Sequence, residues 1–271
     1  MKADAAQKHA SARNNHTPLT TMPPTAPANA ASVTTCYAGQ ANEYHIYVGQ
    51  GLLSQVAPSV MATVGAERYV LLTDTNLHEL HGERLVASFL AEGVELLVKV
   101  LTPGEVTKNR ATKEEVEDWM LEHGCLRNTC VLALGGGVVG DFAGFVAATF
   151  MRGVPVVQIP ASLLAMIDSS VGGKTGLDVP AGKNLIGAFH QPKAVYIDLD
   201  LLKTLPKREL VNGMGELIKY GAFWDEDLFS FLENSVDLIL AKDGAAMQRI
   251  VQRSVEIKVR HVNLVVGYPL V

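Results

Sequence analysis

The stretch that decides the fold is Cys130-Val131-Leu132-Ala133-Leu134-Gly135-Gly136-Gly137-Val138-Val139-Gly140-Asp141. Its apolar half predicts a buried strand, and a helical pattern from Phe142 to Met151 follows the glycines. A glycine turn between a strand and a helix N-terminus lets bare peptide groups approach a pyrophosphate. The spacing fits G-x-G-x-x-G, but no acid stands about twenty residues onward, so a tight, closely packed turn is the alternative interpretation.

Outward from this stretch, strand and helix patterns alternate. Strands are predicted at 44–48, 69–73, 96–101 and 154–159, and helices at 79–91 and 113–122. Such alternation predicts an α/β fold with a mainly parallel sheet covered by helices on both faces. Beyond Leu201 the patterns are helical only, over 208–223, 226–241 and 245–261. We therefore expect an α/β dinucleotide-binding domain over 43–200 and the start of an all-helical domain, cut short, over 201–271.

Composition excludes several classes of protein. The chain has 271 residues, 48% of them hydrophobic, and a formal charge of -5 without a dense Lys/Arg block, which argues against nucleic acid or a membrane surface as partner. No apolar run approaches the ~18 residues of a membrane helix. The cysteines Cys36, Cys125 and Cys130 form no C-x-x-C pair, so we expect free thiols in a reducing compartment such as the cytoplasm.

Residues 1–42 differ in composition from the rest. The first forty are rich in Ala, Thr, Asn and Pro, with Asp4 as their one acid, and show no apolar period. They are predicted to form a disordered tail, with order beginning near Tyr44. The alternative is a plastid transit peptide, although such peptides usually carry more Arg.

A second polar stretch is Asp168-Ser169-Ser170-Val171-Gly172-Gly173-Lys174-Thr175, followed by Gly182-Lys183-Asn184. A P-loop requires Gly where Asp168 stands, which disfavours an NTPase. Glycine amides and lysines between short turns suit phosphate or carboxylate groups, and we predict a functional loop together with Arg152. Solvated loop lysines are the alternative.

The predicted helix 208–223 contains Glu216 and Lys219, which share one face at i and i+3. A surface ion pair is the usual explanation, and a metal-binding carboxylate beside a catalytic ammonium is the functional one. The histidine pair His78 and His81 lacks a third ligand and is interpreted as a solvated helix start.

Taken together, these segments resemble the 3-dehydroquinate synthase family of sugar phosphate cyclases. The resemblance extends from about Tyr44 to Lys258 and rests on residues 73–76, 135–141, 168–175, 182–192 and 213–221. It implies a bound NAD, a divalent metal, usually zinc, and a homodimer acting on 3-deoxy-D-arabino-heptulosonate 7-phosphate in the shikimate pathway. In such a reaction NAD transiently oxidises a ring carbon, phosphate leaves, the hydride returns and the opened ring closes to 3-dehydroquinate.

The resemblance also implies roles for individual residues. The implied NAD-binding residues are Asp74, Glu105, Lys108, Gly136, Gly137, Val138, Asp141, Ala161, Ser162, Lys183 and Thr204. Those implied to meet substrate are Arg152, Asp168, Lys174, Asn184, Lys219 and Lys258. Glu216 is implied as a metal ligand.

The chain departs from the family pattern in three places. Ala161-Ser162 stands where paired threonines are common, and Gly215 where alanine is common. After Lys258 the family's motif with two metal-binding histidines is missing, and His261 does not fit it, so we expect a C-terminally truncated chain with a weakly held metal. A metal-dependent polyol dehydrogenase and a non-catalytic NAD-binding remnant are the alternatives.

Overall fold

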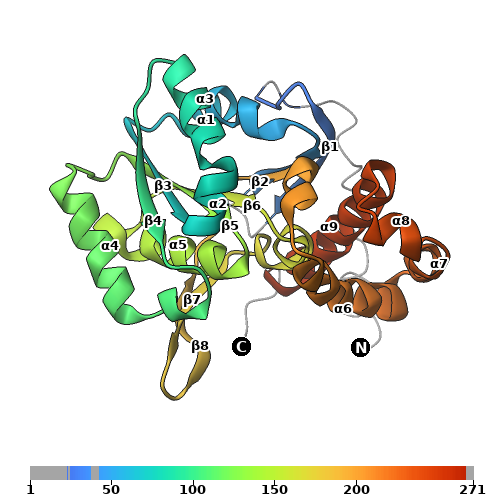
Figure 1. Ribbon diagram of the computed structural model, residues 1–271. Coiled ribbons are helices and arrows are strands. Elements are labelled where there is room, and N and C mark those ends of the chain that lie inside the picture. Colours follow the sequence, from blue (N-terminus) through green and yellow to red (C-terminus); the bar gives the residue numbers. More distant parts are fainter. Residues whose placement is uncertain (1–22, 24, 38–42, 267–271) are drawn as a thin grey trace, which may run out of the picture.

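The computed structural model describes residues 23, 25–37 and 43–266 and is built around a seven-stranded sheet (Figure 1). The strand order is β1-β2-β9-β6-β5-β3-β4. The strands are β1 (Ala30–Tyr37), β2 (Glu43–Gly49), β3 (Arg68–Asp74), β4 (Leu96–Leu101), β5 (Thr129–Gly135), β6 (Val156–Pro160) and β9 (Ala194–Asp198). Every neighbouring pair is parallel except β1 with β2, so the predicted α/β class is confirmed.

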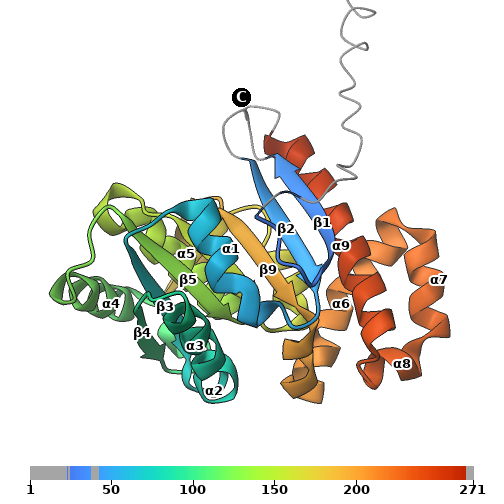
Figure 2. The ribbon, with the colours of Figure 1, turned by 90° about the horizontal axis from the view of Figure 1, so that it is seen from above.

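The sheet buries both faces because its central strands are apolar at consecutive positions. Tyr69 and Leu71 of β3 join one core cluster with α1 (Val56–Val64) and α3 (Glu83–Ala91). Val70 and Leu72 point the other way, into a second cluster with α4 (Arg110–Glu122) and α5 (Gly137–Thr149). Figures 1 and 2 show these helix pairs on opposite faces of the sheet.

The direction of chain progression reverses at β3. From β3 the chain passes through α2 (Thr75–Leu77), η2 (His78–Gly82) and α3 to β4, and then returns through α4 to β5 on the other side of β3. In open parallel sheets, a ligand binds outside the carboxyl ends of the strands where the order reverses. That position here lies between the ends of β3 and β5.

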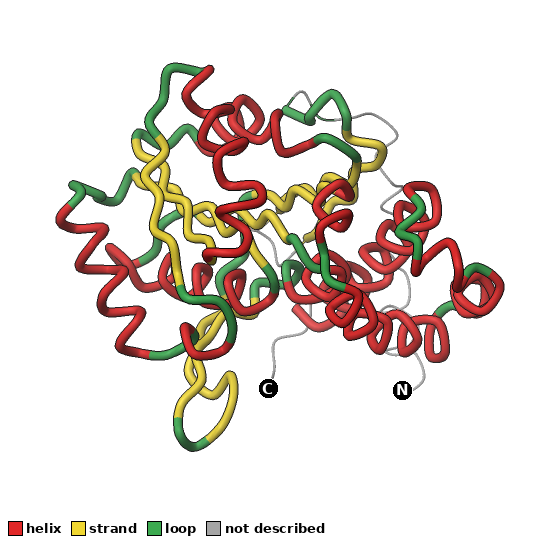
Figure 3. Tube along the Cα trace, in the orientation of Figure 1, coloured by secondary structure: helices red, strands yellow, loops and turns green. Residues whose placement is uncertain are grey.

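A short β-hairpin projects beyond the sheet on the side of α5. Its strands are β7 (Lys174–Val179) and β8 (Gly182–Phe189), shown at the bottom of Figure 3. Thr175 of β7 lies against α5 where that helix has Gly144: a Cβ on Gly144 would stand 2.5 Å from the Thr175 Cγ2. The bare helix surface therefore admits the hairpin.

The C-terminal part of the described chain, from residue 199 to residue 266, is built of helices. It comprises η6 (Leu199–Thr204), α6 (Lys207–Trp224), α7 (Glu226–Asn234), α8 (Val236–Leu240) and α9 (Gly244–Val266). The α9 helix runs alongside β1 (Figure 2), where the Tyr37 amide donates to the Asn263 Oδ1 over 3.1 Å. Within the described residues, no helix is long and apolar enough to cross a membrane.

Several sequence expectations need correction. Residues 30–37 were predicted to be disordered but form β1, which gains a full hydrogen-bonding partner in β2; residues 1–22, 24 and 38–42 lie outside the described residues. The predicted functional loop is largely the hairpin, and β9 had no predicted counterpart. The single helix predicted over 226–241 divides at Ser235.

The structure also tests the predictions for His81 and for the cysteines. His81 is buried rather than solvated, and its Nε2 lies 2.8 Å from the Thr204 Oγ1. The cysteines Cys36, Cys125 and Cys130 are buried free thiols, as predicted.

Candidate active site

Ten of the eleven residues implied to bind NAD follow the carboxyl ends of five parallel strands. Because these ends meet at one edge of the sheet, positions far apart in sequence are gathered there. By strand, they are Asp74 at the end of β3; Glu105 and Lys108 after β4; Gly136, Gly137, Val138 and Asp141 after β5; Ala161 and Ser162 after β6; and Thr204 after β9. The eleventh, Lys183, stands in the hairpin strand β8.

The glycine turn serves packing at one position and leaves open backbone at another. A Cβ on Gly140 would stand 2.9 Å from the Gln158 Oε1, and the Gln158 amide already donates to the Gly140 carbonyl. Gly136 is the N-cap of α5 and supplies no side-chain cap, so the first amides of the helix are free for a ligand. A Cβ on Gly137 would point at the Ser169 Oγ, 3.0 Å away.

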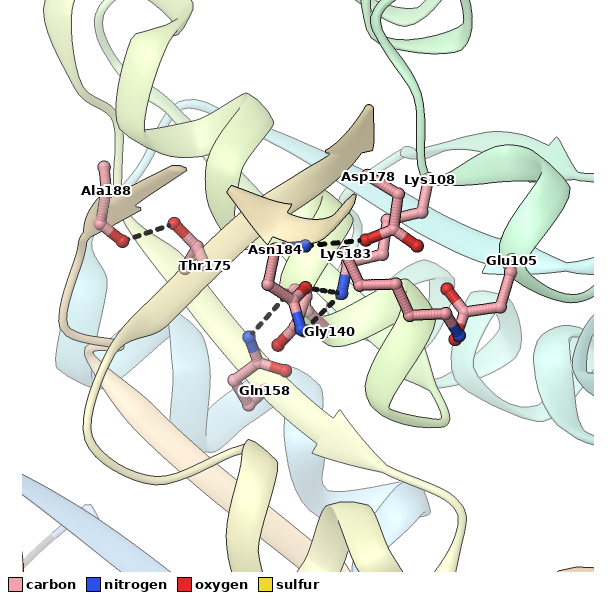
Figure 4. Close-up of polar contacts among 10 residues, drawn as sticks. Glu105, Lys108, Gly140, Gln158, Thr175, Asp178, Lys183, Asn184 and Ala188 are labelled. Atoms are coloured by element: carbon pink, nitrogen blue, oxygen red, sulfur yellow. Dashed lines mark hydrogen bonds and ion pairs between the residues drawn. The ribbon is translucent and has the colours of Figure 1, made fainter. Parts of the chain in front are cut away.

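Lys108 links the N-terminal part of α5 to the hairpin (Figure 4). Its ammonium lies 2.6 Å from the Asp141 Oδ2 and 2.5 Å from the Asn184 Oδ1. The Asp178 amide donates to the Lys108 carbonyl over 2.8 Å, and the Asn184 amide donates to the Asp178 Oδ1 over 2.9 Å. Asn184 is held at φ 57, in the left-handed region, by these bonds. We call this set the Lys108 network.

The electrostatics of the network are dominated by the burial of its ion pair. Burial raises the pKa of the Asp141 carboxyl, and the hydrogen bond and charge of Lys108 oppose that rise only in part. Lys108 is itself 4% exposed. Lys183 and Glu105 pair at 3.0 Å beside it, but both side chains are exposed, so this second pair contributes little to stability.

A cavity of about 520 Å³ opens beside the network. It brings together four residues implied to meet substrate, and its lining includes Asp168, Lys174, Asn184 and Lys258. These four come from η5 (Ala165–Ser169), β7, β8 and α9. The Lys174 ammonium makes no hydrogen bond or ion pair with any described residue, so it can meet an anion without losing a partner.

Asp168 is the best-bonded carboxylate of the cavity. Its Oδ1 accepts from the Lys258 ammonium over 2.6 Å and from the Tyr220 hydroxyl over 2.8 Å. Burial pushes the pKa of Asp168 upward, but Lys258, the Tyr220 hydrogen bond and Lys219 together outweigh it and hold the pKa below its usual value. Asp168 is therefore a carboxylate at neutral pH.

Three predicted residues stand apart from the cavity lining. Arg152 follows α5 in η4 (Phe150–Arg152), is exposed, and has φ 69. Lys219 pairs with Glu216 one turn away on α6, as a surface pair would. Among the described residues no group of three His, Cys, Asp or Glu side chains could hold a metal ion, so Glu216 is a lone candidate ligand.

Two polar residues of the site were given no individual role from the sequence. Ser169 lines the cavity and faces Gly137, and Tyr220 bonds Asp168. Tyr220 carried a usable signal, since it follows Glu216 by four residues and so shares its helix face.

A larger cavity of about 640 Å³ lies between α7 and α9. It contains none of the predicted residues, and its Arg253 is paired with Asp225 and Glu256.

Comparison with known proteins identifies related families and structures. Residues 98–212 match the family described as 3-dehydroquinate synthase N-terminal, and residues 213–264 match 3-dehydroquinate synthase C-terminal. The 3-dehydroquinate synthase of Alkaliphilus metalliredigens is 45% identical over 217 residues, which are 80% of this chain and 60% of that protein. The pentafunctional AROM polypeptide of Yarrowia lipolytica is 48% identical over 203 residues, 72% of this chain and 13% of that protein.

Among solved structures, the 2-epi-5-epi-valiolone synthase of Streptomyces hygroscopicus subsp. jinggangensis, with NAD+ and Zn2+ bound, superposes with a TM-score of 0.77 at 30% identity. The match covers 86% of this chain and 64% of that one, so the chain spans less than two thirds of each of these relatives. With both halves of the family matched in order along residues 98–264, the chain belongs to the 3-dehydroquinate synthase family.

Proposed function

We propose that this chain performs the 3-dehydroquinate synthase reaction of the shikimate pathway. The substrate would be 3-deoxy-D-arabino-heptulosonate 7-phosphate, and the products 3-dehydroquinate and phosphate. The observation that carries the proposal is the cavity in which Asp168, Lys174, Asn184 and Lys258 meet beside the uncapped N-terminus of α5.

The turn into α5 fits the pyrophosphate of NAD. Gly136 leaves the first helix amides free, and the space in front of Gly137 extends to Ser169 on the cavity wall. Asp74, at the end of β3, would accept from the ribose hydroxyls, which accounts for the missing acid after the glycine turn. Bound NAD supplies reversible oxidation of a ring carbon.

The cavity suits a substrate that carries both anions and hydroxyls. Lys174 is free to pair with a phosphate or carboxylate, and the Asn184 side-chain amide can donate to one. The free oxygen of Asp168 can accept from a hydroxyl and orient the sugar ring. An uncharged polyol does not need this many cations, which disfavours the polyol dehydrogenase alternative.

The divalent metal fits the described residues poorly. Glu216 offers one carboxylate, which Lys219 already neutralises, whereas a catalytic zinc takes three protein ligands. A metal at Glu216 would need ligands beyond the described residues. The roles proposed for the described residues therefore do not depend on a metal at Glu216.

The proposal extends to the setting of the protein. We propose a cytoplasmic enzyme acting as a homodimer, with no nucleic acid or membrane as partner. The buried free cysteines fit a reducing compartment such as the cytoplasm.

Calorimetry and a phosphate-release assay test the function together. We expect the purified chain to bind NAD and, with NAD present, a carbocyclic phosphonate analogue of the heptulosonate. Phosphate release from the substrate itself, dependent on NAD, would establish the reaction. NADH formation from glycerol would favour the polyol dehydrogenase instead, and NAD binding without analogue binding would favour the non-catalytic remnant.

A further inference from the structure

Tyr220 lies behind Asp168, outside the cavity lining, and has no role in the reaction as proposed. It lies on α6, it is 3% exposed, and its hydroxyl donates to the Asp168 Oδ1 over 2.8 Å. Its ring packs edge-on against Trp224, with ring centroids 5.8 Å apart. The phenol is therefore fixed both by packing and by a hydrogen bond to a residue of the cavity wall.

The bonding of Asp168 is divided unequally between its two oxygens. Lys258 donates to the same Oδ1 over 2.6 Å, so this one oxygen accepts from both partners. No described residue donates to Oδ2. Because Oδ1 is tied to α6 and α9 at once, rotation of the carboxylate would break two hydrogen bonds, one of them charge-assisted.

We propose that Tyr220 is a positioning residue: together with Lys258 it locks the carboxylate of Asp168 so that Oδ2 is presented to a hydroxyl of the bound sugar acid. This inference rests on the proposed function, in which that sugar acid occupies the cavity. Tyr220 itself does not line the cavity and acts through Asp168.

The specific consequence is a coupling between two residues. If Tyr220 acts through Asp168, its hydroxyl matters to the ligand only while residue 168 carries an oxygen that accepts its hydrogen bond. A residue that merely supports the fold would affect ligand affinity equally in either background. Non-additivity in a double-mutant cycle therefore separates the two roles.

The test measures affinity for the carbocyclic phosphonate analogue, with NAD saturating, in Tyr220→Phe, Asp168→Ala and the double variant. We expect Tyr220→Phe to weaken binding about three- to ten-fold and Asp168→Ala about ten- to hundred-fold. Adding Tyr220→Phe to Asp168→Ala, which has no oxygen left to accept from Tyr220, should change affinity by less than about two-fold. NAD affinity should be unchanged throughout.

A matched control is Tyr196→Phe, which removes another buried phenol hydroxyl, one bonded to Ser59 over 2.7 Å on the far side of the core. It should leave analogue affinity unchanged, so a loss common to both phenylalanine variants would indicate a general effect of stability. Analogue affinity unchanged by Tyr220→Phe, or an equal loss in both backgrounds, overturns the inference alone. Absence of analogue binding by the unmodified chain overturns the proposed function and this inference with it.

Discussion

Replacement of Lys108 by Met tests the network that joins the hairpin to α5. The substitution keeps most of the length of the side chain but removes the ammonium that bonds the Asp141 Oδ2 and the Asn184 Oδ1. Removing one partner of a buried ion pair costs about 3–5 kcal/mol, because the other charge stays buried without compensation. The Asp141 side chain retains 20% exposure, so we expect the lower part of that range, about 3–4 kcal/mol at neutral pH.

The loss should depend on pH in a defined direction. Burial raises the pKa of Asp141 in the folded protein. At pH values between the ordinary pKa of an aspartate and this raised pKa, the native state therefore binds more protons than the unfolded state. The free energy of unfolding therefore falls as pH rises through this window. Without Lys108 the pKa rises further and the window widens. At about pH 4 a larger share of Asp141 is protonated than at neutral pH, so the variant should lose less stability there, approaching the Asn184 hydrogen bond alone, about 1 kcal/mol.

Urea denaturation at about pH 4 and about pH 7.5 measures both values. Lys183→Met is the matched control, because it removes an ammonium from the same region whose pair with Glu105 is exposed, and we expect no measurable change at either pH. A Lys108→Met protein as stable as the unmodified chain, or one whose loss is the same at both pH values, would refute the argument.

Three further predictions concern the two ligands and α6. Gly137→Val should weaken NAD binding by about 1–3 kcal/mol, because the new side chain points at Ser169 across the space in front of α5; equal calorimetric affinity would remove the turn from the cofactor site. Lys174→Met should weaken binding of the phosphonate analogue by about 1.5–3 kcal/mol while NAD affinity stays constant, whereas a solvated lysine would change neither by more than about 0.5 kcal/mol. Gly215→Ala should raise the free energy of unfolding by about 0.5–1 kcal/mol, since a Cβ there meets nothing within 4 Å in the middle of a helix; a lowered melting temperature would contradict this.

The parallel sheet was predictable because its strands carry a local signal. The predicted strand over 96–101 coincides with β4, and the apolar run from Cys130 to Leu134 lies inside β5. Strands buried on both faces must be apolar at consecutive positions, and such a run can be recognised in a short stretch of sequence. The same signal was present in β9, whose residues Ala194 to Ile197 are all buried, so that strand could have been predicted.

The hairpin was not predictable by the same means. Its strands contain Gly176 and Gly187, which ordinarily indicate a loop. The structure gives the reason for both: a Cβ on Gly176 would stand 2.8 Å from the Ile186 carbonyl oxygen, and one on Gly187 would lie closer still to the Thr175 carbonyl oxygen. Glycine is needed because the two backbones approach closely, and that approach is a property of the pair of strands rather than of either sequence.

The same limit applies to the site, because the hairpin is what assembles it. Lys174 and Asn184 stand at positions of β7 and β8 that reach the cavity only when the hairpin crosses α5 at Gly144. Asp168 obtains its partners from α6 and α9, elements whose own periodicity says only that they are amphipathic helices. The residue types that bind anions could be recognised one by one along the chain. These residues come together because glycines permit close packing between elements that are distant in sequence. That packing can be recognised only from the three-dimensional arrangement of the elements.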